Sequence, residues 1–63
     1  MELNSKRVYS LMASKEMSNK ALSIETGIRQ QHLSDILKRG TCTIVTLGRI
    51  AKTLGVDPEE IMK

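Results

Sequence analysis

The sequence predicts a compact all-α domain of five short helices, and three observations support this fold class. Apolar residues recur at helical spacing along most of the chain. Capping residues and glycines divide the chain into short segments at regular intervals. Alternation typical of strands is confined to a short stretch at Thr41–Val45. With 63 residues, the chain has room for one domain, residues 1–63, and for no deep catalytic cleft.

The first helix is expected over about Ser5–Ser14, with Asn4 as its cap. Its inward face follows i, i+3 and i+4 spacing and comprises Val8, Leu11 and Met12, extended by Leu3 and Tyr9. The second helix is expected over Asn19–Thr26, because Ser18 is a good cap and Gly27 tolerates the left-handed conformation that ends a helix.

The third helix is expected from Gln30 to about Lys38, and Gly40 ends it. Arg29 occupies its cap position, where a serine or threonine would be better. The inward residues of this helix are Leu33, Ile36 and Leu37.

The fourth helix is expected between the cap Thr43 and Gly55, with an apolar stripe of Leu47, Ile50, Ala51 and Leu54. Gly48 in its middle suggests close packing of a neighbouring helix. The fifth helix is short and begins with Asp57 as cap, Pro58 in first position and Glu60 closing a capping box.

The segment from about residue 18 to residue 38 has the pattern of a helix-turn-helix. Such a motif needs a small residue where its helices cross and a glycine in the turn, and Ser23 and Gly27 meet these needs. The outward face of the second helix of the motif must be polar if it enters the major groove of DNA. That face comprises Gln30, Gln31, Ser34, Asp35 and Lys38, with His32 to one side.

The stretch MSNKALSIETGIRQQHLSDI resembles the Cro/repressor family, also called the Xre-like helix-turn-helix family. The matching positions are Leu22, Ser23, Gly27, Ile28, Leu33 and Ile36. The later stretch LGRIAKTLGVDPEEIM is similar to the family's fourth and fifth helices, so the likeness extends from about Val8 to Met62. The resemblance implies a lambda-repressor-like DNA-binding domain and a transcriptional regulator, with repression as its expected effect.

The resemblance also implies residue roles, and RQQHLSDI is especially similar to recognition helices of lambdoid phage repressors. Gln30 and Gln31 match the base-reading pair, and Asp35 occupies a third base-reading position. Asn19 matches a phosphate-binding position at the start of the preceding helix. Backbone or auxiliary contacts are expected from Asn19, Lys20, Arg29, His32, Ser34, Lys38, Arg39 and Thr41. The loop from Lys38 to Thr43 is shorter than is usual in the family.

The chemistry of the side chains agrees with these roles for the glutamines. A glutamine amide offers a donor and an acceptor side by side, which fits N7 and N6 of adenine. Asp35 has two interpretations: its carboxylate accepts from cytosine N4, or it pairs with Arg39 four residues later. We favour the pairing with Arg39.

The charge is +3 with a pI near 9.4. Residues 1–56 carry nine Lys or Arg against four Asp or Glu, and residues 57–63 are acidic. This distribution suits a polyanionic partner on one face of the domain.

The single cysteine, Cys42, excludes an internal disulfide, and no zinc cluster, cofactor motif or small-molecule site is evident. No apolar run is long enough to span a bilayer. An enzyme is not expected, because no nucleophile–base pair or phosphate loop is present.

Two functional hypotheses follow. In the first, a cytoplasmic regulator of bacterial or phage origin binds palindromic double-stranded DNA as a homodimer. Candidate dimer contacts are Val45, Val56, Ile61 and Met62. In the second, the same fold is a protein-interaction module, an antitoxin or a partner that masks another regulator, and its surface is formed by the apolar residues Val45, Ile61 and Met62, which are expected to be exposed. Cys42, Ile44 and Val45 pack beneath the loop or belong to a subunit contact.

Overall fold

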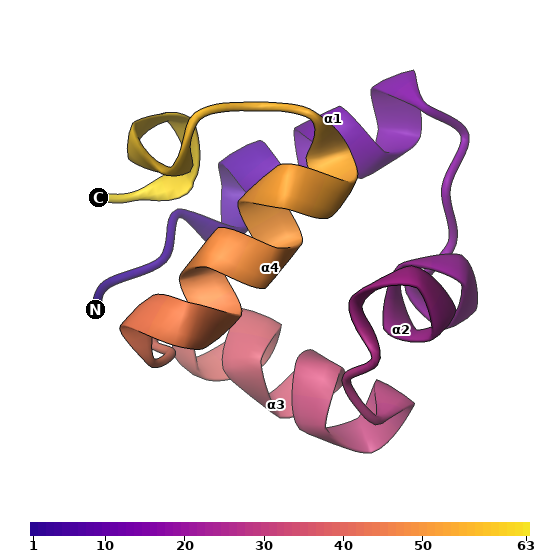
Figure 1. Cartoon of the computed structure of the whole chain (residues 1–63), viewed down its shortest axis with the longest axis horizontal. Coiled ribbons are helices and arrows are strands. Elements are labelled where there is room, and N and C mark those ends of the chain that lie inside the picture. Colours follow the sequence, from indigo (N-terminus) through magenta and orange to yellow (C-terminus); the bar gives the residue numbers. More distant parts are fainter.

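The computed structural model describes all residues, 1–63, and consists of helices joined by short turns (Figure 1). The elements are α1 (Ser5–Ser14), α2 (Asn19–Thr26), α3 (Gln30–Arg39), α4 (Ile44–Leu54) and the 3₁₀ turn η1 (Pro58–Ile61). In Figure 1, α4 runs through the middle of the molecule, and α3 lies along one edge. Helix α4 contacts α2 and η1, while α2 also contacts α3. None of the helices combines the length and apolar character needed to cross a membrane.

The predicted caps explain why the helices begin where they do. The side chain of Asn4 accepts from the backbone N–H of Arg7 at 3.1 Å, and Ser18 accepts from Ala21 at 3.1 Å. Thr43 accepts from the N–H of Thr46 at 3.2 Å. Each cap satisfies one N–H group that has no partner within its own helix. The predicted bounds of α1 and α2 are confirmed, and α3 runs one residue beyond the expected Lys38.

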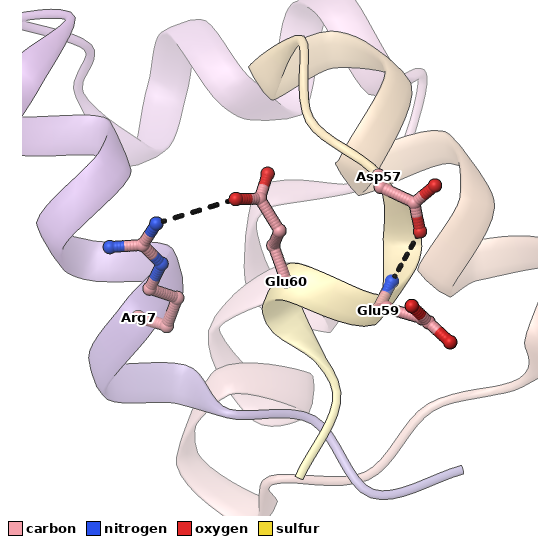
Figure 2. Close-up of polar contacts among 4 residues, drawn as sticks. All are labelled: Arg7, Asp57, Glu59 and Glu60. Carbon is pink, nitrogen blue, oxygen red and sulfur yellow. Dashed lines mark hydrogen bonds and ion pairs between the residues drawn. The ribbon is translucent and has the colours of Figure 1, made fainter.

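The fifth element differs from the prediction, because it is a single 3₁₀ turn and not an α-helix. Asp57 caps it as expected, accepting from the N–H of Glu59 at 2.9 Å (Figure 2). The capping box is wrong: the Glu60 carboxylate instead lies 3.7 Å from a guanidinium nitrogen of Arg7. The turn does not continue because the backbone after it is extended and pairs with the beginning of the chain.

Thirteen buried apolar residues form one core to which every helix contributes. The inward residues predicted for α3 and α4 are all in this core, as are Val8 and Met12 of α1. Two expectations are wrong. Tyr9 is 48% exposed, so it does not extend the buried face of α1. A Cβ built at Gly48 would meet nothing within 4 Å, so no neighbouring helix packs closely there.

The first four residues run between two other segments and join them. The N–H of Leu3 donates to the carbonyl of Gly40 at 2.8 Å, and the N–H of Asn4 donates to Ile61 at 2.7 Å. Isolated antiparallel bridges pair Glu2 with Thr41 and Leu3 with Met62. Of the strand-like stretch at Thr41–Val45, only Thr41 and Cys42 pair with the first residues, and α4 begins at Ile44. This small ladder fixes the loop that follows α3.

Candidate nucleic-acid interface

The turn between α2 and α3 is held by two hydroxyl groups at the end of α2. Gly27 adopts φ 75°, the left-handed conformation that the sequence predicted for the turn. The hydroxyl of Ser23 donates to the carbonyl of Ile28. The buried hydroxyl of Thr26 donates to the carbonyl of Leu22 at 2.7 Å and accepts from the N–H of Ile28 at 3.3 Å. These bonds fix the angle at which α3 leaves α2.

Thr26 is a structural residue of the motif that the sequence interpretation missed. Its place at the last helical position next to Gly27 was visible, but threonine at that position does not by itself indicate burial. It is the only polar residue among those that are buried. A buried hydroxyl that satisfies a backbone group on each side of a turn stabilises one orientation of the two helices.

Helix α3 has one buried and one exposed face. Leu33, Ile36 and Leu37 are buried against the other helices. The six polar residues predicted for the outer surface are all exposed: Gln30, Gln31, His32, Ser34, Asp35 and Lys38. The amides of the glutamines therefore face solvent and are free to meet a partner.

The start of α3 lacks a side-chain cap. Arg29 occupies the cap position with φ −56° and ψ 138°, and its side chain makes no capping hydrogen bond. The first N–H groups of α3 are consequently without a partner from the cap residue, and they carry the positive end of the helix dipole. Arg29 itself is exposed, so its guanidinium adds a positive charge at the same end of the helix.

At the start of α2, Asn19 and Lys20 lie next to the Ser18 cap. Lys20 is exposed, whereas Asn19 is half-buried and its Oδ1 atom is buried without a hydrogen-bond partner. The amide nitrogen is the donor that a phosphate oxygen would require. Asn19 and Lys20 are thus the first two residues of α2, at a helix N-terminus, where anions are favoured.

A hollow of about 330 Å³ lies beside the second half of α3. From α3 it is lined by His32, Asp35, Ile36 and Arg39, and from the following loop and α4 by Thr41, Cys42, Thr43 and Thr46. The expected ion pair between Asp35 and Arg39 is not formed. The single ion pair of the structure joins Arg7 to Glu60. Both side chains are exposed, so water competes with any attraction between them. The preferred interpretation of Asp35 is therefore wrong.

Cys42 is half-buried and packs against the core, as one of its two interpretations expected. Burial raises the pKa of the Cys42 thiol above its usual range, although the N-terminal ammonium lowers it in part. The thiol is accordingly neutral near neutral pH. No group of three or more histidine, cysteine or acidic side chains is placed to hold a metal ion.

The four candidate dimer residues have different environments. Val45 is 64% exposed, and its neighbour Ile44 is 70% exposed, so neither packs beneath the loop. Ile61 is completely buried in the core, so its expected exposure is wrong. The apolar end of η1 turns inward because its backbone pairs with Asn4. Val56 and Met62 are partly buried against the core.

The arrangement is that of a helix-turn-helix DNA-binding domain, with a short polar-faced helix held by buried apolar contacts. A family model described as Cro/C1-type HTH DNA-binding domain matches residues 7–63. The chain therefore belongs to this family of DNA-binding domains, in agreement with the resemblance seen in the sequence. No curated protein and no solved structure matches the chain.

Proposed function

We propose that this protein is a non-enzymatic, sequence-specific transcriptional regulator, a repressor, that reads the major groove of double-stranded DNA with α3. The single observation that carries the proposal is the two-sided character of α3. Its apolar side is clamped in the core, while Gln30 and Gln31 project into solvent at its beginning. A helix of this length fits the major groove, where its first residues meet base edges.

The glutamines supply the specificity in this proposal. Each amide pairs with N6 and N7 of adenine, and such a pair discriminates by about 1–3 kcal/mol. Asp35 is the third base reader, and Ser34 and His32 contribute auxiliary contacts.

Cations around α3 supply the general affinity for DNA. Lys38 and Arg39 follow the recognition face, Arg29 precedes it, and Lys20 lies at the start of α2; all four are exposed. Asn19 and Thr41 complete the proposed phosphate contacts. Such contacts release counterions and position the protein without reading sequence.

Substitution of one residue from each group tests the proposal. Gln30→Ala should reduce affinity for the selected operator by about 1–3 kcal/mol and leave non-specific binding almost unchanged. Lys38→Ala should weaken binding to every duplex and lower the salt slope by about 1. Fluorescence anisotropy with operator and scrambled duplexes, over a range of salt concentrations, measures both. Equal effects of the two substitutions on every duplex would contradict base reading.

The regulator acts as a homodimer on a palindromic operator in this proposal, because one recognition helix reads only a few base pairs. Half-sites are then expected about 34 Å apart. The adjacent exposed side chains of Ile44 and Val45 at the start of α4 support a subunit contact there. Val56 and Met62 are secondary candidates. The site of action is the cytoplasm.

Val45→Ser tests this contact, because it removes apolar surface without adding charge. It should abolish cooperative binding to a duplex with two half-sites and leave binding to a single half-site unchanged. Ile24→Ser is the matched control, since Ile24 is 71% exposed on α2, outside the proposed contact. Loss of cooperativity in the control alone would place the contact on α2.

The same exposed pair, Ile44 and Val45, favours one other function, an interaction module that binds a protein partner. That function predicts that Gln30→Ala and Lys38→Ala leave the biological effect unchanged, whereas Val45→Ser abolishes it. A reporter assay with the three variants separates the two functions.

A further inference from the structure

We infer that Asp35 selects a cytosine in the operator half-site, acting as a free carboxylate at the base edge. The inference rests on the proposed function and adds the identity of one base to it. It begins from the observation that Asp35 is exposed and has no ion-pair partner, although several cations are close in sequence.

Three side chains on the same helix, three or four positions from Asp35, could pair with its carboxylate: His32, Lys38 and Arg39. Pairs at this spacing are common on helix surfaces. In the structure no side-chain nitrogen of these three residues lies within 4.0 Å of the Asp35 carboxylate. The single ion pair joins Arg7 to Glu60. His32, Asp35 and Arg39 all line the hollow beside α3, and they do so without forming an ion pair. The carboxylate is therefore available to a partner outside the chain.

The position of Asp35 directs it toward bases. It follows Gln31 by four residues, so both side chains lie on the same exposed face of α3. Four residues advance about 6 Å along a helix. This is about two steps of 3.4 Å along one DNA strand, so the two residues meet different base pairs in one half-site.

The chemistry of a carboxylate then determines which base it accepts. An ionised carboxylate only accepts hydrogen bonds. Guanine presents N7 and O6 in the major groove and thymine presents O4, all of which are acceptors that repel it. Adenine offers its N6 donor next to the N7 acceptor, so attraction and repulsion are combined. Cytosine offers the N4 donor without an acceptor of its own on that edge, and it is the base that a carboxylate prefers.

The same charge makes Asp35 unfavourable on any other sequence, because phosphates repel it. A carboxylate on the recognition face therefore discriminates in two ways: it gains a hydrogen bond at cytosine and lowers the affinity for duplexes that lack it. This distinguishes Asp35 from the glutamines, which lose a hydrogen bond on a wrong base and experience no charge repulsion.

Selection of binding sites from randomised duplex DNA tests the inference with the full chain. The wild-type protein should select a C·G pair at one position of each half-site. Asp35→Asn preserves the size of the side chain and adds a donor, and asparagine pairs with adenine. This variant should shift the preferred base at that position from cytosine to adenine, with a change of about 5-fold or more in relative affinity and no change elsewhere.

Two further variants separate the readout of cytosine from effects of charge and from action through Arg39. Glu59→Gln removes one negative charge from an exposed residue of η1 and should leave the selected sequence unchanged. Arg39→Ala should weaken all duplexes alike and retain the cytosine. Because Asp35 is exposed, circular dichroism is expected to show equal folding for all of these proteins.

Each possible result has a definite meaning. If Asp35→Asn selects the wild-type sequence at every position, the inference is wrong while the proposed function stands. If Arg39→Ala also loses the cytosine, Asp35 acts through that arginine and does not read the base. If the wild-type protein selects no sequence at all, the proposed function fails and the inference fails with it.

Discussion

Two regions of this small domain are joined in different ways, and the difference corresponds to what each must do. At the turn between α2 and α3, the hydroxyl of Thr26 is buried and bonds backbone groups on both sides. At η1, the side-chain polar contacts are exposed: a cap from Asp57 and a 3.7 Å ion pair between Arg7 and Glu60 (Figure 2). Buried hydrogen bonds define one geometry, whereas exposed ion pairs tolerate several. Polar side chains thus hold the orientation of α3, whereas the C-terminal turn is held by the burial of Ile61 and by backbone pairing, and its polar side chains add little.

The largest effect is expected when the buried side of α3 is damaged. Leu33→Ala removes a fully buried side chain and should cost about 2–5 kcal/mol of unfolding free energy. A domain of this size has modest stability, so the variant should be largely unfolded near physiological temperature. Urea denaturation followed by circular dichroism measures the loss. Ser34→Ala, at the exposed neighbouring position, should stay within about 0.5 kcal/mol of the wild type.

A smaller effect is expected at the turn itself. Thr26→Val keeps the shape of the side chain but leaves the buried N–H of Ile28 without its partner, which should cost about 1–3 kcal/mol. Hydrogen exchange at residues 26–30 should accelerate, and operator affinity should fall as α3 loses its fixed angle. The control is Thr53→Val, the same exchange at a half-buried position near the end of α4. An equal loss in both variants would show that the turn is not specially stabilised.

The smallest effect is expected at the C-terminal turn. Glu60→Gln removes the ion pair with Arg7, whose side chains are 45% and 47% exposed. Such pairs contribute about 0.2–1 kcal/mol, and salt reduces this further. Thermal unfolding at low and high salt measures it against Glu59→Gln, which removes the same charge from the neighbouring residue. A loss as large as that of Thr26→Val would contradict the comparison between the two regions.

The sequence predicted most of the helices because their ends depend on local interactions. Caps such as Ser18 and Thr43 and glycines such as Gly27 act within a few residues, so the pattern of residues is sufficient. The exposed face of α3 was predicted for the same reason, since helical periodicity separates Gln31 from Leu33.

The features that the sequence did not predict depend on contacts between distant segments. The burial of Ile61 and the ending of η1 result from pairing with residues 3 and 4, nearly sixty positions away, which no local pattern indicates. Asp35 is unpaired because water competes with Arg39 for its carboxylate. The i, i+4 spacing of the two residues indicates only that a pair is possible.

The ladder formed by the first residues has a consequence for the loop after α3. The N–H of Leu3 donates to the carbonyl of Gly40 at 2.8 Å, and the N–H of Cys42 donates to the carbonyl of Met1 at 3.0 Å. The amine of Met1 donates in turn to the carbonyl of Cys42 at 2.9 Å. A flexible loop must lose conformational entropy when it settles on a ligand, and this subtracts from affinity. Here the folded chain has already restricted Thr41 before any DNA arrives. In the proposed function, preorganisation of the loop therefore leaves more of the phosphate contact assigned to Thr41 to appear as net binding free energy.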